Sequence, residues 1–109
     1  MKKYKVLFDI EAENDLFEIY SFVAFNDSVE KADVLFSALR KTCYKLTSFP
    51  LRGHIQPELA KIGVKDFREI HYKPFRIIYS VGNKHVFVHC VLDGRRDIQT
   101  ILKERMLRQ

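Results

Sequence analysis

Hydrophobic residues in the first part of the chain recur at the spacing of an amphipathic helix. A short β-rich apolar run, residues 4–8, comes first and predicts a strand. Asp9 then opens a segment with an acidic first turn, which favours a helix N-terminus. One face of this segment is apolar, at i, i+4 and i+7 intervals: Ala12, Leu16, Ile19 and Val23, with Tyr20 beside them. The pattern predicts a helix that ends near Asn26.

A second helical stripe follows almost at once. Asp27 and Glu30 have the D-x-x-E spacing of a capping box, and Pro50 marks the end of the segment. The apolar stripe between them consists of Ala32, Leu35, Phe36, Leu39, Cys43 and Leu46. Because only Asn26 separates the two segments, we predict a tight antiparallel helical hairpin that packs on a sheet.

The second half of the chain has the pattern of strands. Residues 51–65 are predicted to form a loop with a short turn at residues 58–62. Three apolar segments joined by short turns then predict an antiparallel meander: Asp66–Tyr72, Phe75–Val81 and Val86–Leu92. A short amphipathic helix is predicted after Asp97. The order β-α-α-β-β-β-α predicts an α+β fold, with residues 1–109 as a single domain and the helical hairpin on a small, mainly antiparallel sheet.

Positive charge is concentrated in the second half of the chain. The net charge is +5 overall, but residues 1–50 carry seven Lys/Arg against eight Asp/Glu, and residues 51–109 carry twelve against six. The net charge is therefore −1 for residues 1–50 and +6 for residues 51–109. This asymmetry favours an anionic partner, either a nucleic acid or an acidic protein.

Cysteine usage and hydropathy limit the class of protein. Cys43 and Cys90 form no C-x-x-C motif and have apolar neighbours, so both are expected to be buried thiols in a reducing compartment. The chain has no apolar run long enough for a signal peptide or a membrane span. We therefore expect a cytoplasmic protein with no membrane contact.

Three arginines are the candidates for binding an anion: Arg68, Arg76 and Arg96. A guanidinium group suits phosphate or carboxylate because it is always charged and binds two oxygens at once. Arg76 is the strongest candidate, because it interrupts an apolar strand where a β-branched residue would pack better. The alternative is that each is an ordinary surface arginine on a half-solvated sheet.

The histidines predict no metal site, because His54 lies in the loop, His85 in a turn, and His71 and His89 on separate strands. His71 is a candidate general acid or base for phosphodiester cleavage, or a buried or partner-facing histidine. Strand alternation places His71 on the opposite face from Arg68 unless a bulge intervenes. No Ser-His-Asp order or glycine-rich phosphate loop is present, and no cofactor is expected.

Four sequence pieces resemble, in order, the RelE/ParE superfamily of toxins from bacterial type II toxin-antitoxin systems. The pieces are residues 49–53 with 57–59, Phe67-Arg68-Glu69-Ile70, Phe75-Arg76-Ile77-Ile78-Tyr79, and Val91-Leu92-Asp93-Gly94-Arg95-Arg96-Asp97. The resemblance covers nearly the whole chain. It implies a growth-arresting toxin of the plasmid-stabilisation type, neutralised by a cognate antitoxin that wraps its helices and sheet.

Two targets are open within this superfamily. RelE-like members cut messenger RNA in the ribosomal A site without a metal, whereas ParE-like members poison DNA gyrase. The resemblance places Arg68, Arg76 and Arg96 where the ribonuclease branch holds phosphate, and His71 resembles a histidine that some nuclease members use. However, Ile70 and Ile101-Leu102 replace a second basic residue and a C-terminal tyrosine of that branch.

The loop at residues 52–59, the extended hairpin and the closing Asp93-Gly94-Arg95-Arg96-Asp97 look more like the ParE branch, which is favoured by a small margin. A degenerate, non-toxic binding module is a further alternative. An antitoxin partner is expected in every case, because a sheet with apolar residues on both faces and few helices leaves apolar surface to cover.

Overall fold

The computed structural model describes residues 3–107 and confirms an α+β fold. Its helices and strands are, in order, β1 (Lys5–Phe8), α1 (Ile10–Asn26), α2 (Val29–Tyr44), the 3₁₀ turn η1 (Lys45–Thr47), β2 (His54–Ile55), α3 (Pro57–Ala60), β3 (Arg68–Tyr72), β4 (Phe75–Val81), β5 (His85–Asp93) and α4 (Ile98–Met106). The predicted order is correct for the long elements. The predicted loop at residues 51–65 additionally contains β2 and α3.

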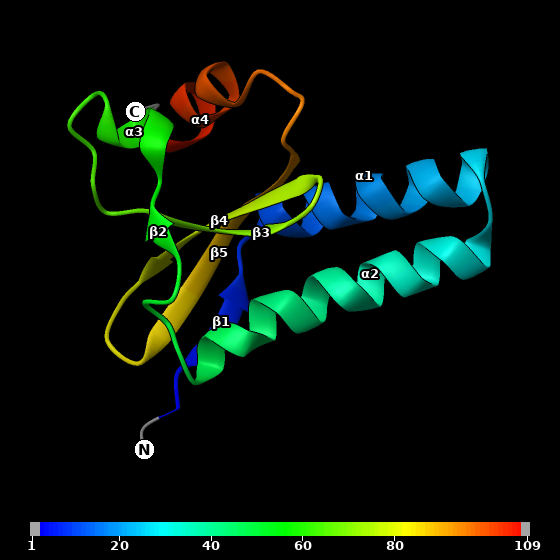
Figure 1. Ribbon diagram of the computed structural model, residues 1–109, viewed down its shortest axis with the longest axis horizontal. Helices are drawn as coiled ribbons and strands as arrows, with labels where there is room; N and C mark the ends of the chain where they lie inside the picture. Colours follow the sequence, from blue (N-terminus) through cyan, green and yellow to red (C-terminus); the bar gives the residue numbers. More distant parts are fainter. Residues whose placement is uncertain (1–2, 108–109) are drawn as a thin grey trace.

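One five-stranded sheet organises the molecule, in the order β1-β5-β4-β3-β2. β1 runs parallel to β5, and the other neighbours are antiparallel. In Figure 1 the α1–α2 hairpin extends to the right as two long antiparallel helices, while α3 and α4 lie together at the upper left. Within residues 3–107, no helix has both the length and the hydropathy that crossing a bilayer requires.

The start of α2 differs from the predicted capping box. Ser28, not Asp27, is the N-cap, and its hydroxyl accepts a hydrogen bond from the Lys31 amide at 3.1 Å. Asp27 instead ends α1, where its own amide donates to the Val23 carbonyl at 2.8 Å. The prediction was wrong by one residue because Asp27 and Ser28 are both good capping residues, and the spacing alone did not distinguish them.

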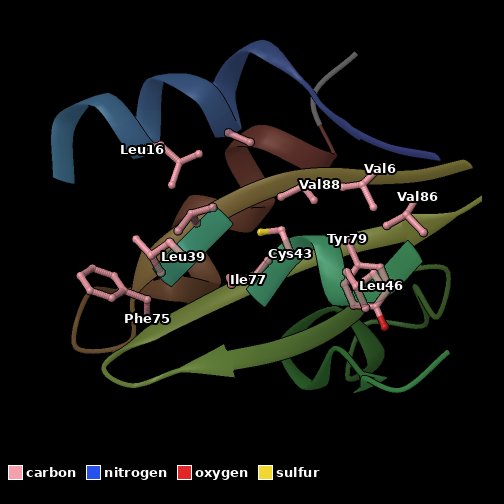
Figure 2. Packing of buried hydrophobic residues seen from close by; sticks show 12 residues of the cluster. Val6, Leu16, Leu39, Cys43, Leu46, Phe75, Ile77, Tyr79, Val86 and Val88 are labelled. Atoms are coloured by element: carbon pink, nitrogen blue, oxygen red, sulfur yellow. The ribbon is translucent and has the colours of Figure 1, made fainter. Parts of the chain in front are cut away.

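β4 is buried on both faces, which explains its nearly continuous apolar sequence. Ile77 and Tyr79 face the helical hairpin, where they join a core that Figure 2 shows between helices and sheet: Val6, Leu16, Leu39, Cys43, Leu46, Phe75, Val86 and Val88. Ile78 faces the other side and packs with Leu59, Cys90, Leu92, Ile98 and Leu102. Both cysteines are buried free thiols, as predicted, and Tyr79 is a core residue.

A β-bulge on β5 changes which side chains share a face. Ile78 pairs with Cys90 and Tyr79 pairs with Val88, so His89 is the extra residue on β5. β3 and β4 pair without any shift, and His71 lies directly opposite Arg76. Glu69, His71 and Arg76 therefore share the face that carries α3 and α4, whereas Arg68 lies on the face of the helical hairpin.

Candidate functional site

Arg76 lies at the centre of an ion-pair cluster on the α3 side of the sheet. Its guanidinium makes four hydrogen bonds to two carboxylates. Nε and Nη2 donate to the two oxygens of Glu69 at 2.9 and 3.0 Å, and Nη1 and Nη2 donate to those of Glu58 at 3.0 and 2.6 Å. The side chain is 19% exposed. Arg76 is therefore a largely buried ion-pair partner of two acids, and every nitrogen of its guanidinium donates at least one hydrogen bond to them.

Glu69 is the most buried charged member of this cluster, with a side chain that is 2% exposed. The amide of Gln56 donates to Glu69 Oε1 at 3.0 Å and to Glu58 Oε1 at 2.7 Å. The oxygen of the same Gln56 caps α3 by accepting from the Leu59 amide at 2.8 Å. This link explains why α3 positions Glu58 over the sheet. A four-residue helix with a proline at its first position needs such a cap to hold its orientation.

Both carboxylates of the cluster are held in the ionised form. Burial acts to raise the pKa of Glu69, but hydrogen bonds from Arg76, Gln56 and His71 outweigh it and leave the pKa below its usual value. The pKa of Glu58 is lowered in the same way, with burial opposing and Arg76 and Gln56 prevailing. The two acids in turn raise the pKa of Arg76 further. With one cation and two anions, the cluster has a net charge of −1.

Two histidines that are distant in the sequence, His54 and His71, meet at Glu69. His71 Nε2 lies 2.5 Å from Glu69 Oε2, and His54 Nε2 lies 3.7 Å from the same oxygen. The two imidazole rings contact each other edge to face, with centroids 5.3 Å apart. The predicted separation of the four histidines is wrong for this pair, because His54 belongs to β2 and pairs with Glu69 of β3.

The other two candidate arginines lie elsewhere. Arg68 shares a face with Ile70 and directs Nη1 to the Gly53 carbonyl at 2.7 Å, so it supports the loop before β2. Arg96 follows β5 and lines a hollow with Ile19, Phe22 and Phe75 on the α1 side. The structure thus brings Arg76 and His71 together through Glu69 and separates them from Arg68 and Arg96.

Arg95 and Asp93 form an exposed ion pair beside this hollow. Arg95 Nε and Nη2 lie 2.9 and 2.5 Å from the two oxygens of Asp93, and this bond holds the pKa of Asp93 at about 2. Asp97 caps α4 by accepting from the Thr100 amide at 3.2 Å. The acids of the closing segment therefore have local structural roles.

Ser80, His89 and Asp9 form a hydrogen-bond chain that no sequence motif predicted. Ser80 Oγ lies 2.7 Å from His89 Nε2, and His89 Nδ1 lies 2.8 Å from Asp9 Oδ2. Asp9 also caps α1 through its other oxygen, at 3.0 Å from the Ala12 amide. Ser80 lies within β4, where the ladder to β5 uses backbone amides that an oxyanion hole would need. We assign the chain a structural role that ties the start of α1 to the sheet.

The missed members of the central cluster gave weak signals. Strand alternation does place Glu69 with His71, but nothing in the sequence aligns His71 with Arg76 across the turn between β3 and β4. Glu58 and Gln56 come from a segment that reads as a loop. The pairing of β2 with β3 brings this segment to Glu69, and the sequence pattern does not indicate that pairing.

Comparison with known proteins identifies the family. Residues 6–98 match the family described as ParE toxin of type II toxin-antitoxin system, parDE. The chain belongs to the ParE toxin family. It is thus a toxin of a type II toxin-antitoxin system, and the resemblance to the RelE/ParE superfamily is confirmed.

The relatives of this ParE-family toxin are distant in sequence. Toxin ParE3 of Caulobacter vibrioides is 24% identical over 91 residues, which cover 84% of this chain and 87% of ParE3. Among solved structures, the chromosomal ParDE system from P. aeruginosa matches with a TM-score of 0.69 and 19% identity, over 82% of this chain and 94% of the other. The RelBE2 toxin-antitoxin complex from Mycobacterium tuberculosis matches with a TM-score of 0.64 and 18% identity, over 85% and 93%. These structures establish the shared fold.

Proposed function

We propose that this ParE-family toxin arrests growth by binding and poisoning DNA gyrase in the cytoplasm, and that a cognate antitoxin neutralises it. One observation carries the choice of a binding toxin over a ribonuclease. The guanidinium of Arg76, the strongest candidate for holding a phosphate, already makes four hydrogen bonds to Glu58 and Glu69.

A phosphodiester bound by two N–H groups of Arg76 would have to displace at least one carboxylate. Because the cluster already carries a net charge of −1 and both acids are ionised, a second anion is repelled rather than attracted. Phosphoryl-transfer and cleavage sites need positive groups aimed at the developing charge. The environment of Arg76 is the reverse of that requirement.

The positions of Arg68 and Arg96 support the same choice. Arg68 lies across the sheet from Arg76 and binds a backbone carbonyl, and Arg96 lines the hollow beside α1. Three arginines that bind one phosphate must converge within hydrogen-bond reach of it. Their dispersal favours protein recognition by the ParE branch.

The second candidate function is a ribosome-dependent mRNA endoribonuclease, and the His71–Glu69 pair is the observation in its favour. The His71 side chain is 44% exposed, and its ring is oriented by a buried carboxylate. An imidazole held in this way is suited to general acid or base catalysis. In this alternative Arg68, Arg76 and Arg96 bind phosphate and His71 moves the proton.

Exposed aromatic residues on the helical hairpin are the expected docking surface for the antitoxin. Phe17 and Phe22 are each 69% exposed, and Phe25 is 90% exposed. Phe17 also lines a groove between the helices with Leu16, Tyr20 and Phe36, and Phe22 lines the hollow beside Arg96. Exposure of aromatic side chains to water is unfavourable in free energy, so a partner with apolar side chains is expected to cover them. The two solved relatives named above are described as toxin-antitoxin systems, which supports the same partner class.

The test is to free the full chain from copurifying antitoxin and divide it between two assays. In the first, the toxin is incubated with gyrase, ATP and supercoiled plasmid, and linear DNA is measured. In the second, it is added to ribosomes programmed with a defined message, and new 5′ ends are mapped. We expect linear DNA from the first assay and no A-site cleavage from the second.

The variants Arg76→Gln and His71→Gln, each checked for folding by circular dichroism, separate the two functions. His85→Gln is the matched control for His71, because His85 is the first residue of β5, where it bonds the Asn83 carbonyl outside the cluster, and not a turn residue as the sequence predicted. If A-site cleavage occurs and is lost in Arg76→Gln and His71→Gln but not in His85→Gln, the ribonuclease function replaces the gyrase proposal. If the folded protein has neither activity and its expression is harmless, both are overturned in favour of a non-toxic binding module.

A further inference from the structure

Three side chains on the β2–β3 edge of the sheet converge as metal ligands would. Because His54 pairs with Glu69 across the strands and His71 is two residues beyond Glu69, all three project from the same face. One nitrogen or oxygen atom from each lies within 4.8 Å of the others. Two imidazoles and one carboxylate form a ligand set that zinc uses in proteins.

We propose that His54, Glu69 and His71 bind a divalent transition-metal ion of the zinc class. This site is independent of the target that the toxin acts on. Zinc bonds of ~2.0 to 2.2 Å in tetrahedral geometry place ligand atoms roughly 3.3 to 3.6 Å apart. The two imidazole nitrogens lie 2.5 and 3.7 Å from Glu69 Oε2, so small rotations of the histidine side chains reach that spacing.

The site is built around a carboxylate that is already oriented. Glu69 is held by Gln56 and by Arg76, and Arg76 is held in turn by Glu58. Such outer hydrogen bonds fix the direction of a metal-binding carboxylate and preserve its charge. The net charge of −1 on the Arg76, Glu58 and Glu69 cluster also attracts a divalent cation.

Arg76 does not block the metal position. Each carboxylate oxygen has two lone pairs, and Arg76 Nε uses one lone pair of Glu69 Oε2, at 2.9 Å. In the metal-free protein, His71 Nε2 donates its proton to the other lone pair. On binding, that proton leaves Nε2 and exchanges through water to Nδ1, and the freed lone pair of His71 Nε2 and the lone pair of Glu69 Oε2 both turn to the ion.

Access to the site is open from solvent. The side chains of His54 and His71 are 55% and 44% exposed, whereas Glu69 is 2% exposed. An ion therefore binds between the buried carboxylate of Glu69 and the exposed imidazoles of His54 and His71. Water completes its coordination. Because His54 lies on the two-residue strand β2, the bound ion ties this edge strand to β3.

The experiment is a zinc titration of the full chain by isothermal calorimetry, after removal of any histidine tag and treatment with a chelator. Zinc content is measured in parallel by mass spectrometry, and cobalt(II) absorption reports the coordination geometry. We expect one ion per chain and a raised thermal midpoint. His54→Gln and His71→Gln should each weaken binding at least about tenfold, since each removes one of three ligands.

His85→Gln is the control, because His85 bonds the Asn83 carbonyl at 2.9 Å and lies outside the cluster. Its zinc affinity should equal that of the unmodified chain. The proposal is overturned if the unmodified chain shows no saturable binding, or if His54→Gln and His71→Gln, folded by circular dichroism, bind as tightly as it does. Equal weakening in His85→Gln would also overturn it, by showing binding to scattered surface histidines.

Discussion

Arg105 of α4 donates two hydrogen bonds, of 2.7 and 2.9 Å, to Asp15 of α1, and the two residues are 90 positions apart in the sequence. The Asp15 side chain is 2% exposed and also accepts from the Val91 amide at 3.0 Å. The acid lies on the apolar face of α1, where Arg105 compensates its charge and the Val91 amide donates a further hydrogen bond. The pair therefore joins the last helix to the first across β5.

Removing Arg105 should destabilise the fold more than the loss of an exposed pair. Arg105→Ala leaves Asp15 buried and only partly satisfied, and we expect a loss of about 3 kcal/mol, the usual cost of breaking a buried pair. Urea unfolding measures the change. Arg95→Ala breaks the exposed pair with Asp93 and should leave the urea midpoint nearly unchanged. Equal effects of the two variants would contradict a special role for Asp15.

Gly53→Ala should be strongly destabilising because the residue lies against β3 and Tyr79. A Cβ at this position would approach the Tyr79 hydroxyl to 2.6 Å and the Glu69 carbonyl oxygen to 2.7 Å. Relief requires a backbone shift, and overpacking of this kind costs about 1 to 3 kcal/mol.

The double variant with Tyr79→Phe separates the two clashes. Tyr79→Phe removes the hydroxyl, which accepts from the Gly53 amide at 3.0 Å and donates to the Pro50 carbonyl at 2.8 Å. Gly53→Ala should still destabilise the Tyr79→Phe background, because the Glu69 carbonyl remains. Full rescue of stability in the double variant would show that the hydroxyl is the sole obstacle. Thermal denaturation followed by circular dichroism is sufficient for this comparison.

Glu58 should stabilise the protein in a pH-dependent way. Its folded pKa lies below the ordinary 4.5, so its contribution is complete above pH 4.5 and is lost as the pH falls through the folded value. Glu58→Gln should therefore cost about 2 kcal/mol at pH 7, as expected for a charge-assisted bond, and less on acidification. Urea unfolding at several pH values, with a chelator present, checks this. The exposed Glu104→Gln is the control, and a pH-independent cost for Glu58→Gln would exclude the charge as the cause.

Neither cysteine should react in the folded protein at pH 8. Burial raises the pKa of both Cys43 and Cys90 to about 12, so roughly one thiol in 10⁴ is ionised at that pH. A chromogenic disulfide reagent should report no fast thiol without denaturant and two thiols in urea. Rapid native reaction at either residue would show that its part of the core opens readily.

The sequence patterns predicted the fold well and the candidate site partly. The helical stripes located α1 and α2, and alternation correctly put Arg68 and His71 on opposite faces. The pattern of an arginine within an apolar strand correctly indicated a polar partner for Arg76. The partners are two acids of the same chain, whereas the prediction was an external phosphate or carboxylate. Charge attraction is the same in both cases, so the residue type alone did not distinguish them.

By itself, the sequence determined the periodicity of each long element and hence the α+β class, because side-chain spacing of 3.6 or 2 is a local property. Only the tertiary structure decided which polar groups meet. His54, Glu58 and Gln56 reach Glu69 through the β2–β3 pairing and through α3, and Arg105 reaches Asp15 across the sheet. Such contacts depend on strand register and on the docking of short segments, which are set by packing over the whole chain and leave no periodic trace in the sequence.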